Sequence, residues 1–524
     1  MFDKGYKKST IYSIRPAVVC VSHLLDGGII NTEPLPASQK QGLLFFLRPH
    51  IGWVLSILLP LLIYFTLKGL SAPLPENSVR FIAIIALATV MWMFRLTHAF
   101  VPALLILLLT ILFDVAPREV AFSGFTSEAF FLCLGIFIMA AQVFSSGLLT
   151  RFSMILLRIL PRARFSRNLI LFLNGGLLSM VLPSPVGRAA LLTPLTFELI
   201  EDIPGVREKK LDLTPLIVSL TQGATLLSVV FLIGNPLNLI LLDLAGNETK
   251  IIYGQWLDWF VPSEAAALVL ILGWLLVMLG LSIGNTLPPI DKEKVKKRLA
   301  DMGPMTSHEA GAVLAILIFG ASALTINFHH ISLAWIAFGM GIILYLYDVA
   351  TPQDLRSNVD WGTLLFIAAL TSWQPILSYL KLDAAIIESL RGSLDSLQLA
   401  AYVDQKFDQL PYLILALTAG IILIRFLLPG GPTFIILMTA LTPIVVDAGI
   451  SAWALGFTIL TLSEGFILSY QHGAYTQAMA ELAQRNLLSC YNPRKLFIAS
   501  VFLMFTRAAA VIVSFWYWRY IHAF

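Results

Sequence analysis

The sequence predicts an all-α protein that crosses a membrane several times and is built from two inverted repeats. Three observations predict this fold class. Of the 524 residues, 58% are hydrophobic and 13% charged, which is about half the charged fraction of an ordinary soluble chain. Apolar runs long enough to span a bilayer recur from residue 51 almost to the C-terminus, and the two halves of the chain show the same order of elements. This composition excludes a soluble enzyme.

The first predicted span is residues 51–67. About fifty mixed residues precede it, so it lies too far along the chain to be a secretory signal and is expected to be retained. Further apolar runs predict membrane helices throughout the chain. They are residues 79–94, 98–113, 129–149, 168–200, 212–245, 257–284, 309–326, 332–347, 361–380, 410–447, 452–483 and 496–518.

Two of these runs, 168–200 and 410–447, are too long for one span and are interrupted by Pro and Gly. The interruptions read LPSPVG from Leu182 and LPGGP from Leu428. Irregular backbone at membrane depth is tolerated only where protein or a water-filled cavity surrounds it. We therefore expect both runs to form re-entrant hairpins.

The distribution of Lys and Arg sets the expected topology, because cytoplasmic loops carry the excess of positive charge. The predicted cytoplasmic side holds Lys4, Lys7, Lys8, Arg15, Arg151, Arg158, Arg162, Arg164, Arg167, Lys292, Lys294, Lys296, Lys297 and Arg298, whereas the external segment 381–408 is mainly acidic. We expect the clusters to set topology rather than bind a specific lipid or partner.

Four segments follow from this topology in a cell (inner) membrane, with the N-terminus in the cytoplasm and the C-terminus outside. They are a cytoplasmic N-terminal segment (1–50), the first span with the first repeat (51–290), a basic cytoplasmic linker (291–307), and the second repeat with the last span (308–524).

The two repeats correspond element by element. Residues 131–150 correspond to 361–380, and each is followed by a hairpin and then by a long run with a polar break. The broken helices are 212–245, interrupted by GNPLN from Gly234, and 452–483, interrupted by SYQHG from Ser469. The first hairpin is expected to enter from the cytoplasm and the second from outside. Inverted repeats of this kind are typical of secondary transporters, with the substrate site near the membrane midplane.

Several short motifs resemble those of the divalent anion/sodium symporters of the ion transporter superfamily. They are Arg95–Pro102 (RLTHAFVP), Gln222–Thr225 (QGAT), Gly234–Asn238 (GNPLN) and Asp360–Trp361. The resemblance covers roughly residues 79–518. It implies a scaffold domain, a transport domain that moves as an elevator, and a homodimer.

The tips and breaks supply the predicted substrate site, because free N–H groups and helix N-termini favour an anion where they converge. Its residues are Ser184, Pro185, Val186, Gly187, Arg188, Asn235, Pro236, Asn238, Gly430, Gly431, Pro432, Thr433, Gln471 and His472.

The hairpin tips depart from the family pattern. In the family each tip carries Ser-Asn-Thr, which the resemblance implies helps to bind a sodium ion and a substrate carboxylate. Here Pro185 and Val186 replace Asn and Thr at the first tip, and glycines and Pro432 dominate the second. A sodium site needs several oxygen ligands, and Arg188 would repel a cation nearby. The sequence therefore predicts sodium-independent transport, by exchange or by proton coupling, with sodium symport as the alternative.

Four ionisable residues lie deep in apolar segments, where a charge needs a partner, a wet cavity or a function. Arg188 is the predicted fixed cation for the anion, and the alternative is an ion pair of Arg188 or Arg425 with Glu464. Arg425 is expected to extend to the nearer membrane interface. Glu464 and His472 are the candidates for proton coupling, and the alternative for His472 is a hydrogen bond within the break.

The expected function is secondary active transport of a small carboxylate- or sulfate-like anion. The alternatives are a sodium-coupled dicarboxylate symporter and a receptor that kept the transporter fold but only binds. An enzyme is not expected, since an HExxH pattern does not occur. Cys20, Cys133 and Cys490 lie far apart, so neither a metal site nor another cofactor is predicted. The expected partners are the small anion, membrane lipid and a second copy of the chain, and not nucleic acid.

Overall fold

The computed structural model describes residues 37–69, 74–159, 164–201, 203, 206, 208, 211–245, 255–284, 291–347, 351–382, 385, 410–447, 451–468 and 471–521. The chain divides into two units, 1–51 and 52–524, and helix α2 (Ala37–Lys68) contains the boundary. The predictions on Cys20, Lys4, Lys7, Lys8, Arg15, Arg162, Ser469, Tyr470 and most of 381–408 fall outside the described residues.

Every regular element in the described ranges is helical, which confirms the all-α prediction. Within the part of the chain that the structure describes, six helices are long and apolar enough to cross a membrane, so the protein is an integral membrane protein. They are His50–Lys68 within α2, α3 (Glu76–Phe94), α6 (Glu128–Ser145), α12 (Gln255–Ser282), α14 (Ser307–Leu324) and α26 (Pro493–Tyr520).

Shorter helices complete the scaffold. Two of them, α4 (Phe100–Leu112) and α16 (Leu333–Leu346), agree with predicted apolar runs. The predicted run 361–380 is divided at Ser372 into two helices, α18 (Trp361–Thr371) and α19 (Trp373–Tyr379). Other short elements outside the hairpins and the broken helices are α5 (Arg118–Ala121), η1 (Ser123–Thr126), α7 (Leu148–Ile159), α13 (Lys292–Asp301), α15 (Ile326–His329), α17 (Pro352–Asn358) and η6 (Leu488–Cys490).

Arg151 of α7 forms a buried ion pair. Its Nε lies 2.7 Å from Oε1 of Glu309, which is buried at the start of α14. The guanidinium also donates to the carbonyls of Met302, Gly303 and Pro304. A buried cation needs a paired charge and satisfied donors, and this Arg has both.

The first predicted hairpin is a helix–turn–helix, and a broken helix follows it. The hairpin consists of α8 (Arg164–Leu178) and α9 (Pro185–Ile200). Ser184 caps α9 and Pro185 occupies its first turn, where a missing N–H carries no penalty. The broken helix consists of α10 (Thr214–Thr225), the short turn η2 (Leu232–Gly234) and α11 (Pro236–Ala245).

The second repeat has the same order of elements. Its hairpin consists of α22 (Leu410–Leu427) and α23 (Gly430–Asp447), and its broken helix of α24 (Ala452–Ser463) and α25 (Gly473–Gln484). Both interruptions therefore fall where Pro and Gly predicted them.

Side chains satisfy the unwound backbone of the first break, as buried carbonyls require. From α12, Trp259 Nε1 donates to the carbonyl of Val229 and Ser263 Oγ donates to that of Val230. Asn238 Nδ2 donates to the carbonyls of Ser228 and Phe231. In the second break, Gln471 Oε1 accepts from the N–H groups of Ile467 and Leu468.

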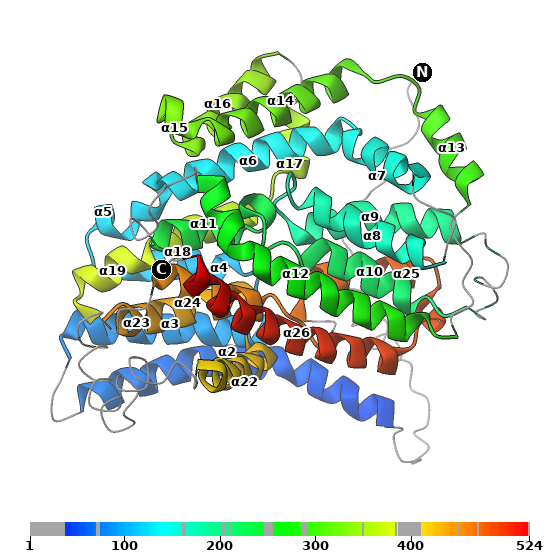
Figure 1. Ribbon diagram of the computed structural model, residues 1–524. Coiled ribbons are helices and arrows are strands. Elements are labelled where there is room, and N and C mark those ends of the chain that lie inside the picture. Colours follow the sequence, from blue (N-terminus) through cyan, green and yellow to red (C-terminus); the bar gives the residue numbers. More distant parts are fainter. Residues whose placement is uncertain are drawn as a thin grey trace, which may run out of the picture. The chain divides into compact units, whose positions relative to one another are not determined.

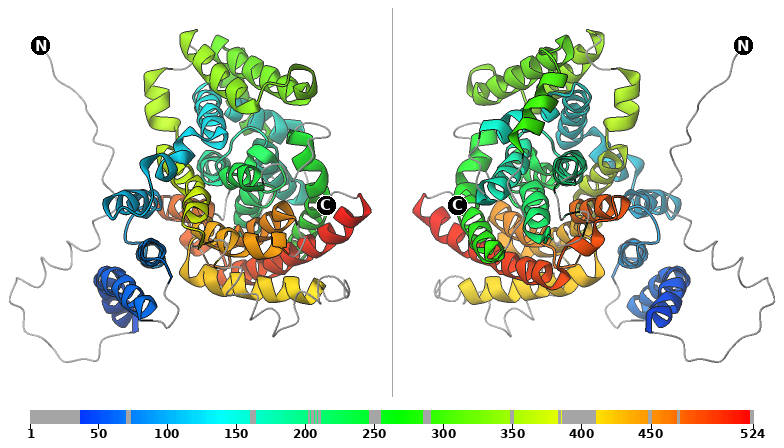
Figure 2. Two further views of the ribbon diagram at one scale, coloured as in Figure 1. Left: turned by 90° about the vertical axis from the view of Figure 1, so that its left-hand side faces the viewer. Right: turned by 90° about the vertical axis from the view of Figure 1, so that its right-hand side faces the viewer.

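Close packing holds these elements in unit 52–524. Figures 1 and 2 show α12 running beside α26, and α14 and α16 lying together beyond α6. Helices α8 and α10 approach backbone to backbone, because a Cβ on Gly175 would lie 2.4 Å from the carbonyl carbon of Gly223. Small residues allow such contacts between membrane helices. The first hairpin is thereby fixed against its own broken helix.

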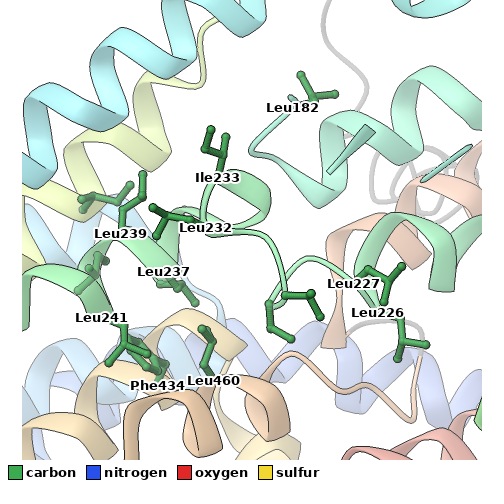
Figure 3. Close-up of a cluster of buried hydrophobic side chains, with 14 of the residues drawn as sticks. Leu182, Leu226, Leu227, Leu232, Ile233, Leu237, Leu239, Leu241, Phe434 and Leu460 are labelled. Carbon is green, nitrogen blue, oxygen red and sulfur yellow. The ribbon is translucent and has the colours of Figure 1, made fainter. Parts of the chain in front are cut away.

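Buried apolar side chains surround the first break and join it to the second repeat. Figure 3 shows Leu226, Leu227, Leu232 and Ile233 along the break. In the same view Leu241 of α11 lies beside Phe434 of α23 and Leu460 of α24. Buried apolar side chains therefore link the first repeat to the second.

Candidate functional site

One cavity of about 720 Å³ lies where both hairpin tips and both helix breaks meet. Helix α18 and the turn before α4 complete it. The lining residues are His98, Ala99, Phe100, Ser184, Pro185, Val186, Asn235, Pro236, Leu237, Asp360, Gly362, Thr363, Phe366, Ile367, Arg425, Pro429, Gly430, Gly431, Pro432, Glu464, Gln471, His472 and Gly473.

Four helices of the two hairpins and the two broken helices begin at this cavity. Their first residues are Pro185 (α9), Pro236 (α11), Gly430 (α23) and Gly473 (α25), and all four line it. A helix N-terminus carries unsatisfied N–H groups and the positive end of the helix dipole. Four N-termini that converge on one cavity make it a favourable place for an anion.

Polar side chains at the tips and breaks cap these helices. Ser184 Oγ accepts from the N–H of Gly187 at 3.1 Å, and Asn235 Oδ1 accepts from the N–H of Leu237 at 3.0 Å. His472 Nδ1 accepts from the N–H of Ala474 at 3.1 Å. The caps fix the direction in which each helix starts.

Arg188 lies behind the first tip and does not line the cavity. Its side chain is fully buried, and its donors reach backbone carbonyls. Nη1 donates to Leu182 and, at 3.0 Å, to Gly234, and Nε and Nη2 donate to Ala224 at 3.0 and 2.7 Å. Arg188 therefore lies behind the residues that line the predicted site and does not reach the cavity.

Arg425 lines the cavity from the second hairpin. The expectation that it extends to the membrane interface is wrong, because its side chain is only 3% exposed and points inward. It donates to the carbonyls of Leu428 at 3.0 Å, Gly465 at 3.2 Å and Gln471 at 2.8 Å. Hydrogen bonds to these three carbonyls stabilise the buried guanidinium more than contact with water at the membrane surface would.

Glu464, which is buried, and His472, which is partly buried, form a pair on the cavity wall. His472 Nε2 lies 3.3 Å from Glu464 Oε2. Because Nδ1 of the same ring accepts the N–H of Ala474, the ring proton is assigned to Nε2, which donates to the carboxylate.

Positive charge exceeds negative charge among the buried groups near this pair. Arg507 of α26 is 1% exposed, its Nη1 donates to the carbonyl of Thr461 at 2.8 Å, and its Nη2 is buried without a hydrogen-bond partner. The buried charged groups here are thus three arginines, Arg188, Arg425 and Arg507, and one carboxylate, Glu464. A second carboxylate, Asp360, also lines the cavity but is exposed. In a medium of low effective dielectric this excess favours an added anion.

Most residues of the predicted site line the cavity, and four lie behind it. Gly187, Arg188, Asn238 and Thr433 are behind the lining. Thr433 Oγ1 donates to the carbonyl of Pro429. These four residues contribute to the shape of the tips and of the first break.

The sequence reasoning missed one wall of the cavity, made by His98, Phe100, Asp360, Thr363 and Phe366. A signal for part of it was available. Asp360 accepts from the N–H of Thr363 at 2.9 Å and from its hydroxyl at 2.7 Å, and an Asp three residues before a Thr at the start of an apolar run is a capping pattern.

A helical membrane protein with an anion-favouring cavity between hairpin tips and broken helices belongs to the class of membrane transporters. More particularly, this chain belongs to the citrate transporter family, whose model matches residues 89–462.

Known transporters show the same relationship. The chain is similar to the chloroplastic dicarboxylate transporter 2.1 of Arabidopsis thaliana (26% identical over 294 residues, 53% of this chain and 51% of that protein). It is also similar to an uncharacterized transporter of Haemophilus influenzae (25% over 359 residues, 64% and 70%) and to the chloroplastic dicarboxylate transporter 2 of Spinacia oleracea (25% over 296 residues, 54% and 51%). The matches span about half the length of the two plant proteins. The family and these relatives are transporters and not enzymes.

Proposed function

We propose that this protein is a secondary active transporter of a small di- or tricarboxylate. The observation that carries the proposal is the cavity at which four helix N-termini meet, with Arg425 on its wall and a buried excess of positive charge around it. A volume of about 720 Å³ is within the usual range of small-molecule sites. The names of the family and of two relatives, which refer to citrate and dicarboxylates, support the same substrate class.

The proposed mechanism is alternating access through the two repeats. The two hairpins are re-entrant from opposite faces, and the transport domain moves as an elevator within a homodimer, with the N-terminus in the cytoplasm of a cell membrane and the C-terminus outside. The matched order of hairpin and broken helix in both repeats supports this mechanism. Accessibility of single cysteines at Ser184 and Thr433 tests it, since labelling of both from one side only in every state would exclude inverted hairpins.

We further propose that transport needs no sodium. Proton coupling through Glu464 and His472, or anion exchange, takes its place. The ionisable pair on the cavity wall supports coupling to protons.

Counterflow into proteoliposomes tests the function. Vesicles loaded with unlabelled citrate, malate or sulfate should accumulate the labelled anion, and replacement of external sodium by choline at fixed pH should leave the rate unchanged. Binding of the anion without counterflow would select the receptor alternative, whereas a saturable sodium requirement would select sodium symport.

A further inference from the structure

Arg188, behind the first tip, and Arg425, on the cavity wall beside the second, make corresponding connections. Each donates to a carbonyl in the turn before its hairpin's tip, to a carbonyl at or just after the end of the first half of its broken helix, and to a carbonyl two residues before the second half. The matched carbonyls are those of Leu182 and Leu428, of Ala224 and Gly465, and of Gly234 and Gln471.

The two arginines reach these equivalent places from different arms. Arg188 lies in α9, after the first tip, whereas Arg425 lies in α22, before the second tip. A simple duplication of one ancestral residue would place both on the same arm. The shared feature is therefore the position of a positive charge among three carbonyl oxygens.

Three buried carbonyl oxygens that lie close together are stabilised by a cation or by a positively charged donor. The carbonyl of Ala224 lies in the last turn of α10, and that of Gly465 follows the end of α24, where the helix dipole is negative. Unwound carbonyls and the C-terminal ends of half-helices are the groups that coordinate cations in transporters with broken helices. Carbonyl oxygens left together without a donor or a cation would be costly in a buried place.

We propose that Arg188 and Arg425 are built-in cations, each of which occupies a cation position in its repeat and holds a hairpin tip against its own broken helix. This inference deepens the proposed function and rests on it. Its consequence for transport is that an arginine fills each of the two cation positions, so neither position requires an ion from solution. Arg188 and Arg425 act as positioning residues, and the anion meets the helix N-termini that they hold in place.

Removal of either side chain should open a site for a free cation. In Arg188→Ala and Arg425→Ala, three carbonyls face a space of guanidinium shape. We expect both variants to unfold at lower temperature in detergent and to transport about tenfold more slowly or worse, because three carbonyls lose a charged donor. Guanidinium chloride at millimolar concentration should restore most of the thermal shift and transport in a saturable manner, with no such effect on the unaltered protein.

Two controls separate a cation site from mere filling of space. Urea has a similar shape and similar donors but no charge, so it should not restore either variant. Arg507→Ala removes a buried arginine that donates to one carbonyl, that of Thr461, and guanidinium should restore it far less. Equal restoration by urea, or equal restoration of Arg507→Ala, would overturn the proposal.

A second pair of variants covers the case in which the alanine variants do not fold. Arg188→Lys keeps the charge and Arg188→Gln keeps polarity without charge, so the lysine variant should be the more stable. Equal stability of the two, or a more stable glutamine variant, would refute a cation role. The thermal readout does not require transport. If the unaltered protein showed no counterflow, the proposed function would fail while the cation proposal would still be decided.

Discussion

His472 donates through Nε2 to Glu464 at 3.3 Å while its Nδ1 is engaged by the backbone N–H of Ala474. A second proton on the ring would have to occupy Nδ1, and the cap of α25 would then be lost. Glu464 has no such constraint. In the proposed proton coupling, the carboxylate is therefore the member of the pair that takes up the proton, and His472 orients it.

Glu464→Gln should abolish the response of transport to a pH gradient. Glutamine keeps the size and the hydrogen-bonding ability of the side chain but cannot exchange a proton. Anion exchange at equal pH on both sides should continue. The measurement is uptake by proteoliposomes with and without an imposed pH gradient. A variant that still follows the gradient would show that the proton travels elsewhere, and loss of both modes would assign Glu464 to substrate binding or folding.

Substitutions of His472 should separate its two contacts. Asparagine is a good N-cap residue, so His472→Asn should keep α25 intact while it removes the contact with Glu464. His472→Ala should lose both contacts and be less stable than the Asn variant by about 1 kcal/mol. Denaturation in detergent measures the difference. Equal stability of the two variants would mean that the cap contributes little.

A contact between repeats should limit the size of residue 473. A Cβ on Gly473, at the start of α25, would lie 2.5 Å from Cγ2 of Val186 at the first tip. Gly473→Ala should therefore reduce transport, and Val186→Ala in the same chain should restore it, because the double variant removes the clash. A double-mutant cycle on transport rate measures the coupling. Additive effects would show that the first tip and the start of α25 do not meet during transport.

The contact between α8 and α10 should tolerate no side chain. Gly175→Ala places a Cβ 2.4 Å from backbone atoms of Gly223, and overpacking of this kind costs about 1–3 kcal/mol. Gly320→Ala is the matched control, since a Cβ there would meet nothing within 4 Å. The melting temperature should fall only for Gly175→Ala. A similar fall for both variants would point to a general effect on helix packing in detergent.

Local signals in the sequence predicted the helices, both tips and both breaks. Clustered Pro and Gly disfavour a continuous helix, so Pro183 to Pro185 and Pro429 to Pro432 predict the turns without reference to the rest of the chain, whereas the single Pro194 and Pro262 lie within helices. The division of 361–380 at Ser372 was missed. Ser372 Oγ accepts from the N–H of Gly124, 248 residues away, and no local pattern reports such a contact.

The direction of Arg425 was unpredictable for the same reason. Its acceptors on Gly465 and Gln471 lie 40 and 46 residues further along the chain, and a short distance to the membrane surface offers an equally reasonable alternative. Only the packing of α22 against the second break decides whether the Arg425 side chain points to these carbonyls or to the membrane surface.

Main-chain recognition of Arg188 also affects how the sequence can diverge. Each of its hydrogen bonds ends on a carbonyl, at Leu182, Ala224 or Gly234, and every amino acid supplies a carbonyl. Side chains at Leu182 and Ala224 can therefore change without changing what the arginine meets, provided that the backbone keeps its path. Gly234 is the exception, because a Cβ there would lie 2.6 Å from the carbonyl oxygen of Ser228. Correlated substitutions, which report contacts between side chains, should be absent between this arginine and the residues that it touches.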